Sequence, residues 1–409
     1  MTAQTGEVDR GGIDTASACG DESDMTRHAS LRSLRIPVAL CALFALSGVD
    51  GCGESSTHTD PDGWVRSSPS AEGMRNSVLV RARDYAFVDG RNTQGVVVVR
   101  HGRIAAEWYA EDASVDSYAA SWSMAKSFTS ALVGIALAEG SIPSLDVPIA
   151  TYVPSWQGGE RDAITLRDVL EMSSGLAWDE TYGGASDIGD MVFTEGSHLA
   201  IVAAKPLAST PGTTFNYSSG DTMLLSAVLQ GATGMPVADY AELHLFAPLG
   251  LANVQWWRDA TGQTLTYCCL DMRSRDFARF GELFLRGGMW NGASVVPSDW
   301  VAASLSPSPS FEGYGFQWWL LGRTDPELPA DTFAAIGHDG QFIYVVPSLD
   351  LVVVRNGTYF KYDGEPVAVP YLFKRYPSDG LFDRLGTAPP DEWSDAAFLG
   401  PIIDSIVGE

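Results

Sequence analysis

The sequence predicts an α+β fold in which an antiparallel sheet, built from both ends of the chain and flanked by helices, carries an inserted, mostly helical domain. Strand patterns occur before residue 110 and return only after residue 314, while helical patterns fill the middle. The length of 409 residues allows a substantial core. A content of 45% hydrophobic and 11% aromatic residues is typical of an ordered globular protein.

A hairpin and a long helix are predicted in the first third of the chain. The apolar run 96–99 and the segment 104–109 flank a His101-Gly102 turn, which favours two antiparallel strands. The segment 122–139 is rich in Ala and Leu and is followed by Gly140, a residue that commonly ends a helix.

The remaining elements follow from the same kinds of pattern. Helices are predicted near 166–173, 196–204, 219–232, 236–247, 274–286 and 297–304. Strands are predicted over 314–321, 342–346 and 351–355, and a closing helix over 396–407. The globular domain is therefore expected over 73–409, with the helical insertion at about 145–305.

The first 52 residues resemble a leader that contains a signal peptide, and Met25 is a second candidate for the true start of the protein. Three Arg side chains precede an apolar run over 36–48, which is too short for a permanent membrane helix. Gly51 before Cys52 resembles a bacterial lipoprotein cleavage site, so we expect export and a lipid on Cys52. The protein would then reach the membrane of the cell envelope or periplasm only through that anchor. Residues 53–72 have the composition of a linker.

Composition excludes several classes of partner and cofactor. A formal net charge of −25 would repel the phosphates of nucleic acid. No residue spacing indicates a metal site, and no Gly-rich turn indicates a dinucleotide, so we expect no cofactor. The adjacent Cys268 and Cys269 are interpreted first as small buried residues, with a vicinal disulfide as the alternative. The oligomeric state is not predicted.

Ser123 and Lys126 are the candidate nucleophile and base. Their spacing of three residues places both side chains on one helix face, and Ser123 lies in the first turn, where the dipole favours developing negative charge. Burial among Ala, Phe and Leu would lower the pKa of the Lys126 ammonium toward that of a useful base. Taken without the other motifs, the pair is also compatible with a structural role, in which Ser123 caps the helix and the Lys126 side chain extends to solvent.

Two later segments supply the other groups that a covalent hydrolase needs. Tyr217 precedes a predicted helix and would shuttle a proton if Lys126 held it near ionisation. Gly340 follows His338 and would let a substrate backbone lie close, while the Gln341 N–H would complete an oxyanion hole with that of Ser123. Taken singly, these segments are also compatible with a core aromatic and an ordinary turn.

Together, Ser123-x-x-Lys126, Tyr217-x-Ser219 and His338-x-Gly340 resemble the three motifs of the class C β-lactamase-related serine hydrolases, and most closely their 6-aminohexanoate-dimer hydrolase branch. The resemblance covers about residues 70–400. It implies a β-lactamase/transpeptidase-like fold and substrate contacts from Ser219, His338, Gly340 and Gln341. In that branch a further Tyr reaches the substrate amide, and Tyr182 matches its position.

The resemblance implies an enzyme that cleaves an amide or ester bond of a small molecule, such as a short oligoamide, through an acyl-enzyme on Ser123. True class C β-lactamases have Asn and Lys where this chain has Ser219 and His338, which puts efficient lactam cleavage in doubt. The alternative is a peptidoglycan-binding or penicillin-binding sensor that acylates with little turnover. An α/β-hydrolase is disfavoured because no Gly-x-Ser-x-Gly elbow is present.

Overall fold

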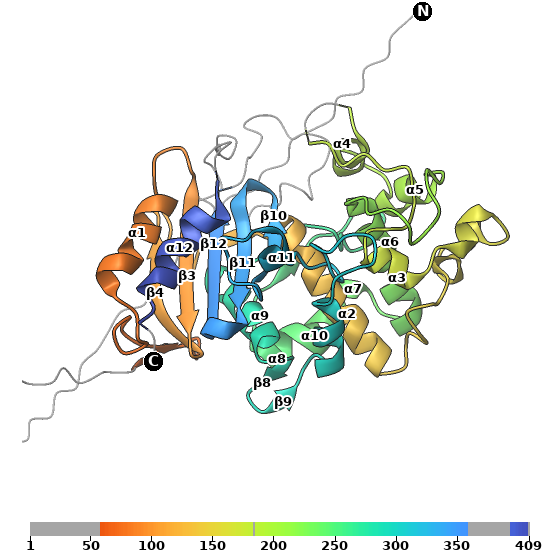
Figure 1. The fold of residues 1–409 in the computed structure, drawn as a ribbon. Helices are drawn as coiled ribbons and strands as arrows, with labels where there is room; N and C mark the ends of the chain where they lie inside the picture. Colours follow the sequence, from red (N-terminus) through yellow and green to blue (C-terminus); the bar gives the residue numbers. More distant parts are fainter. Residues whose placement is uncertain (1–57, 183–184, 359–392, 408–409) are drawn as a thin grey trace, which may run out of the picture. The chain divides into compact units, whose positions relative to one another are not determined.

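The computed structural model describes residues 58–182, 185–358 and 393–407 (Figure 1). The predicted leader over 1–52, with Met25 and Cys52, lies outside these ranges, so export and lipidation stay predictions. None of the helices in the described ranges has both the length and the hydropathy that crossing a bilayer would require.

A seven-stranded sheet combines strands from both ends of the chain, in the order β1-β2-β4-β3-β12-β11-β10. All neighbours are antiparallel except β2 and β4. In the predicted hairpin, His101 and Gly102 both have positive φ, as a two-residue turn between twisted strands requires. The α+β fold is confirmed. The strands of this sheet are β1 His58–Thr59, β2 Val65–Arg66, β3 Thr93–Arg100, β4 Arg103–Tyr109, β10 Phe333–Gly337, β11 Gln341–Val346 and β12 Leu351–Gly357.

Helices cover both faces of the sheet, which explains why the run 96–99 in β3 is apolar without alternation. Val97 and Val99 belong to the core that includes helix α9 (Ser274–Leu285), whereas Val96 and Val98 belong to the core under α1 (Asn76–Ala86) and α12 (Asp395–Ser405). Helix α9 approaches closely at Gly281, where a Cβ would lie 2.6 Å from a methyl group of Val352. Helix α9 thus packs on the sheet although it falls within the range of about 145–305 predicted for the helical insertion, and the bounds of that insertion stay a prediction.

The prediction of a strand over 314–321 is wrong. The backbone turns at Gln317, whose φ is +63°, and its N–H donates to the Leu170 carbonyl at 3.2 Å. The aromatic residues that suggested a strand pack instead in the core, where the Trp318 ring stacks on Phe280. The edge of the sheet is β10, which the sequence pattern did not predict, and the same holds for α1.

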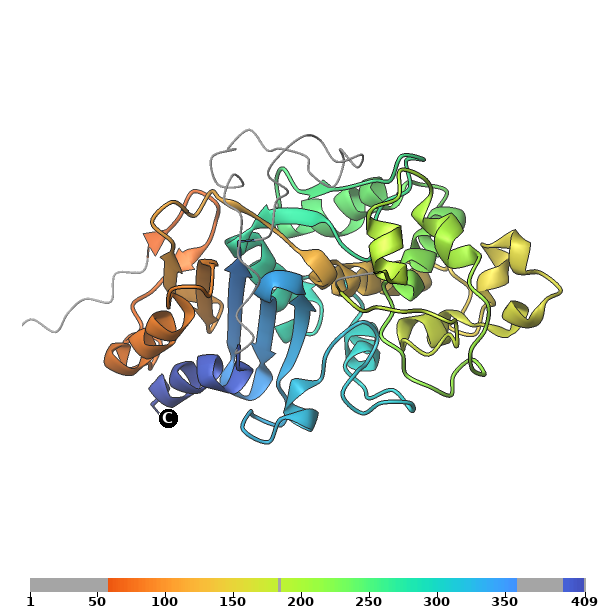
Figure 2. The same cartoon turned by 90° about the horizontal axis from the view of Figure 1, so that it is seen from above.

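Helices α3 to α6 lie on the β10 side of the sheet (Figure 2). Helix α2 is the central helix of this group, and its residues from Ala125 to Ala136 are buried. The remaining helices of the described ranges are α2 Ala125–Ala138, α3 Leu166–Leu170, α4 Asp187–Val192, α5 His198–Ala203, α6 Ser219–Thr233, α7 Val237–Ala241, α8 Ala247–Leu249, α10 Ser298–Ser304 and α11 Leu321–Thr324. The short helical turns of the described ranges are η1 Trp122–Met124, η2 Ile149–Thr151, η3 Pro154–Trp156, η4 Glu160–Ala163, η5 Glu242–Phe246, η6 His338–Gly340 and η7 Pro347–Leu349. The strands of the small sheets are β5 Tyr118–Ala120, β6 Gln255–Trp256, β7 Leu270–Arg273, β8 Met289–Trp290 and β9 Ala293–Ser294.

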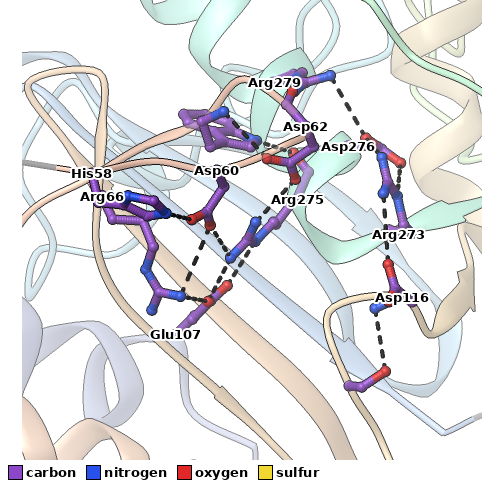
Figure 3. A network of polar contacts seen from close by, with 12 residues as sticks. His58, Asp60, Asp62, Arg66, Glu107, Asp116, Arg273, Arg275, Asp276 and Arg279 are labelled. Carbon is purple, nitrogen blue, oxygen red and sulfur yellow. Dashed lines mark hydrogen bonds and ion pairs between the residues drawn. The ribbon is translucent and has the colours of Figure 1, made fainter. Parts of the chain in front are cut away.

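A network of buried charges ties the start of the described chain to α9 (Figure 3). The Arg275 guanidinium lies 2.8 Å from an Asp60 oxygen, 3.0 Å from Asp62 and 2.7 Å from Glu107. Asp60 and Asp62 fall in the segment 53–72, whose charged composition predicted a linker. The described residues of that segment instead form β1, β2 and half of this network, because α9 supplies the opposite charges.

Replacing Arg275 with Met should cost about 3–5 kcal/mol of unfolding free energy, because three mostly buried carboxylates would lose their shared partner. Denaturant titration of both proteins measures this change. Arg83→Met is the matched control, since Arg83 pairs with Asp84 at an exposed site, where such pairs contribute about 0–1 kcal/mol. Equal losses in the two variants would contradict a structural role for the network.

Candidate active site

Ser123 lies in η1, the single 3-10 turn that leads into α2. Trp122 before it has a φ of +44°, a left-handed conformation that is unfavourable for a bulky residue. Such strained residues cluster at functional sites, where the surrounding fold holds them in place. The Lys126 Nζ, one turn further, donates to the Ser123 Oγ at 2.8 Å. The two predicted side chains therefore meet directly.

Lys126 is buried, with 1% of its surface exposed. Burial lowers the pKa of its ammonium to about 8, although the negative charge of Glu180 acts in the opposite direction. Besides Ser123, its Nζ donates to the Ser219 Oγ at 3.0 Å and to the Tyr267 carbonyl at 3.1 Å. An amine with this pKa is partly unprotonated near neutral pH, as a general base must be.

Tyr217 lies in the loop before α6, with the Lys126 Nζ 5.1 Å from its ring centre. Burial and the charge of Glu180 raise the pKa of the Tyr217 hydroxyl well above its usual value, and hydrogen bonding with Ser123 only partly offsets this rise. The condition that Lys126 holds this hydroxyl near ionisation is therefore not met. Tyr217 is a neutral phenol that can donate a proton, which leaves Lys126 as the base.

Ser219 is the first residue of α6 and is buried beneath Lys126. Its hydroxyl accepts from the Lys126 Nζ and donates to the Glu180 Oε1 at 2.5 Å. The same carboxylate accepts the Ser219 backbone N–H at 2.8 Å and the Trp178 Nε1–H at 2.5 Å. Sequence reasoning missed Glu180, whose only signal was its place between Trp178 and Tyr182.

Tyr182 and His338 form the exposed rim above these groups. Tyr182 is 51% exposed, and its hydroxyl donates to the Glu180 Oε1 at 2.8 Å. Its ring meets the His338 imidazole edge to face, with centres 4.8 Å apart. The His338 Nδ1 lies 2.7 Å from a carboxylate oxygen of Asp339. Tyr182 and His338 are thus both exposed, and their contacts with a substrate stay predictions.

Gly340 and Gln341 connect the rim to the sheet. A Cβ at Gly340 would lie 1.9 Å from the Arg355 guanidinium, so the required space is on the protein side, a different reason from the close substrate approach expected from the sequence. The Gln341 side chain is buried and donates to the Gly357 carbonyl at 2.7 Å.

The end of β10 brings the start of β11 close to the nucleophile. Gly337 pairs with Gln341 in the sheet, and a Cβ at Gly337 would lie 2.2 Å from the Ser121 carbonyl oxygen. Only a glycine permits this approach of β10 to η1. The Gln341 N–H is therefore near the Ser123 turn, while its role in an oxyanion hole stays a prediction.

Cys268 and Cys269 form a vicinal disulfide, the alternative that the sequence left open. Both residues are buried, and Cys269 has a φ of +64°. Their carbonyls accept hydrogen bonds from the Trp256 indole and the Trp257 backbone. The disulfide follows Tyr267 immediately, so it fixes the backbone whose carbonyl contacts Lys126.

The arrangement provides a nucleophile, a buried amine of lowered pKa and two neutral phenols around one hydroxyl. Within the described ranges, no group of three or more His, Cys, Asp or Glu side chains is placed to hold a metal ion. These are the components of covalent acyl transfer at Ser123.

The chain is similar to several known proteins in sequence and in fold. The family model described as Beta-lactamase matches residues 86–369. The 6-aminohexanoate-dimer hydrolase of Paenarthrobacter ureafaciens is 26% identical over 291 residues, which cover 65% of this chain and 73% of that protein. A D-stereospecific amidohydrolase from Streptomyces sp. has a similar fold, with a TM-score of 0.54, 19% identity, and coverage of 69% of this chain and 94% of that one. A family VIII carboxylesterase superposes with a TM-score of 0.55 at 15% identity, covering 74% and 97%.

Proposed function

This chain belongs to the beta-lactamase family, and on that premise we propose that it is a serine hydrolase that cleaves an amide or ester bond through an acyl-enzyme on Ser123. The observation that carries the proposal is the 2.8 Å contact between the Lys126 Nζ and the Ser123 Oγ. A lysine whose pKa is lowered to about 8 by burial can remove the proton of that hydroxyl.

Acylation begins when Lys126 takes the Ser123 proton and the Oγ attacks the substrate carbonyl carbon. The resulting oxyanion would be stabilised by the N–H groups of Ser123 and Gln341. The intermediate collapses as the bond to the leaving nitrogen or oxygen breaks and the Tyr217 hydroxyl protonates that atom. The proton stored on Lys126 then restores Tyr217, which leaves an ester on Ser123 and the first product free.

Deacylation follows the same path in reverse, with water in place of the leaving group. Neutral Lys126 takes the Tyr217 proton, and the Tyr217 oxygen takes a proton from water as the water oxygen attacks the ester carbonyl. The bond to the Ser123 Oγ then breaks, and that oxygen regains its proton from Lys126. Both steps need one base and one acid, and these are the roles that Lys126 and Tyr217 are positioned to fill.

We propose short oligoamides or small esters as the substrate class. Two observations support this class: the 26% identical relative is named for cleavage of the 6-aminohexanoate dimer, and the Tyr182 hydroxyl is within hydrogen-bonding reach of Ser123. Pocket shape decides between amide and ester, because the same acyl-enzyme serves both.

A substrate panel tests the proposal: p-nitrophenyl esters, nitrocefin, D-Ala peptides and the 6-aminohexanoate dimer. We expect steady turnover of esters or of the dimer, and slow cleavage of nitrocefin because Ser219 and His338 replace the Asn and Lys of true class C enzymes. A stoichiometric burst without further turnover on every compound would instead support the sensor alternative.

Tyr182→Phe should slow amide cleavage about ten- to a hundredfold, the value of one hydrogen bond formed in the transition state, while ester cleavage changes little. The reason is that an amine leaves only when its nitrogen is protonated or held by a donor, whereas a phenolate leaves unaided. The measurement is kcat/KM for an amide and a p-nitrophenyl ester with the same acyl group, so the ester is the internal control. If kcat/KM falls equally for the amide and the ester, Tyr182 contributes packing and not a hydrogen bond to the leaving nitrogen.

A further inference from the structure

The hydrogen bonds around Lys126 raise the question of which way its lone pair points. Three oxygen atoms lie within hydrogen-bonding distance of the Nζ: the Ser123 Oγ at 2.8 Å, the Ser219 Oγ at 3.0 Å and the Tyr267 carbonyl at 3.1 Å. A protonated lysine donates to all three. A neutral lysine has two N–H groups and one lone pair, so one of the three oxygens must supply a proton.

Only one of these oxygens is free to do so. The Tyr267 carbonyl has no proton, and the Ser219 proton is directed to the Glu180 Oε1, 2.5 Å away. The Ser123 hydroxyl is the remaining donor, so the lone pair of neutral Lys126 faces the nucleophile. This orientation depends on Glu180 accepting from Ser219.

From this we infer that Glu180 is a positioning residue: by accepting the Ser219 proton, it leaves Ser219 as an acceptor for Lys126 and directs the Lys126 lone pair at Ser123. The inference rests on the proposed function, since it concerns the deprotonation of Ser123. Glu180 acts through Ser219 and does not itself touch the reacting atoms.

The Glu180 carboxylate is held firmly enough for this role. Its Oε2 accepts the Trp178 indole N–H at 2.5 Å and the Ser219 backbone N–H at 2.8 Å, while its Oε1 accepts the hydroxyls of Ser219 and Tyr182. Four donors from three residues fix both oxygens, and charge-assisted hydrogen bonds of this kind are the strong ones. One carboxylate therefore links the rim tyrosine, the start of α6 and the base.

The charge of Glu180 also acts on the titration of the site. It raises the pKa of Lys126 against the effect of burial. The other groups that face Lys126 are the rings of Tyr217 and Tyr267, and the pKa of Tyr217 is raised. Behind Glu180, the carboxyl of Asp221 in α6 has a pKa raised to about 7, first by burial and in smaller part by Glu180.

Glu180→Gln keeps the shape of the side chain but replaces one carboxylate oxygen, which only accepts hydrogen bonds, with an NH2 group that donates them. Its amide can donate to the Ser219 Oγ, which frees the Ser219 proton to point at Lys126 and compete with Ser123. We expect the rate at which a fluorophosphonate labels Ser123 to fall about ten- to a hundredfold, the range usual for the orienting partner of a reactive group. The pH midpoint of labelling, expected near the Lys126 pKa of about 8 in the parent protein, should also move to lower pH because the nearby negative charge is lost.

Three further variants keep the test specific. Asp179→Asn removes an exposed carboxylate one residue away, which solvent screens, and should leave rate and midpoint unchanged. Ser219→Ala removes the link, so adding Glu180→Gln to it should change the labelling rate by less than about twofold while still lowering the midpoint. Asp221→Asn removes the second group that titrates near neutrality, so the midpoint in that background belongs to Lys126.

The outcomes separate the two proposals. A parent protein that turns out unlabelled on Ser123 by peptide mass spectrometry would overturn the proposed function, and this inference with it. If the parent is labelled on Ser123 but Glu180→Gln is labelled at the same rate with the same pH midpoint, the positioning role is wrong and the proposed function stands. A rate loss that is equally large in the Ser219→Ala background also overturns the role, because Glu180 would then act without Ser219.

Discussion

Ser123→Ala is expected to lower kcat by a factor on the order of 10⁶ on any substrate that the enzyme turns over, the loss typical of removing a serine nucleophile. Lys126 and Tyr217 would remain in place, but no atom could carry the acyl group. Because the Ser123 side chain is small and only partly buried, its loss should leave the fold intact. Steady-state kinetics and a thermal unfolding curve measure the two effects separately.

Ser130→Ala is the matched control for this change. Ser130 lies on the same helix, and its buried hydroxyl has no hydrogen-bond partner within the described ranges, so its loss should be nearly neutral. Mass spectrometry of the fluorophosphonate adduct should identify the peptide that contains Ser123 in the parent protein and in the control. Residual turnover of Ser123→Ala above one per cent would assign the chemistry to another residue.

Periodicity predicted the parts of the fold whose pattern matches their environment. The hairpin of β3 and β4, helix α2 and the pair β11 and β12 have patterns that burial on one or both sides explains directly. The pattern over 314–321 led to a wrong prediction because its aromatic residues lie in a loop and pack in the core from there. An alternation of period two does not distinguish such a loop from a strand. Helix α1 mixes apolar residues with charged ones, and its buried Leu79, Ala82 and Ala86 pack in the core that it shares with α12.

Residue spacing predicted that site residues on the same helix lie together. Site residues on separate elements were predicted by the resemblance of their motifs to a known family. Ser123 and Lys126 are one helical turn apart, so their meeting follows from helix geometry alone. Tyr217, Ser219, Tyr182 and His338 come from different segments, and no local pattern brings them together. The structure places all four around the Ser123–Lys126 pair.

Sequence reasoning missed two contributions to the site. Glu180 is one of 51 acidic residues, and only the tertiary fold brings four donors to its carboxylate. The Tyr267 contact with Lys126 is made by a backbone carbonyl, which carries no side-chain identity. Cys268 and Cys269 after Tyr267 were interpreted first as small buried residues, which gave no reason to expect that the preceding carbonyl contacts the base.

Lys126→Met and Tyr217→Phe should each cut turnover by about 10²–10⁴-fold, the contribution expected of a general acid–base group, and the double variant should be little worse than the poorer single variant. The reason is that the two groups share one proton path. Lys126, with its pKa of about 8, takes the Ser123 proton, and Tyr217, whose pKa is raised, delivers a proton to the leaving group. Once either is missing, the proton can no longer pass from Ser123 to the leaving group along this path. A double-mutant cycle in kcat/KM measures the coupling.

The packing of Tyr217 permits a clean comparison. Its ring centre lies 5.3 Å from that of Trp319 and 6.1 Å from that of Tyr314, and Phe keeps both contacts. Tyr314→Phe removes a hydroxyl from the adjacent ring and should change turnover by less than about tenfold, which separates loss of a nearby hydroxyl from loss of the proton donor. If the two single losses multiply in the double variant, Lys126 and Tyr217 act independently. If Tyr217→Phe is neutral on every substrate, the proton must reach the leaving group from Lys126 or Tyr182 instead.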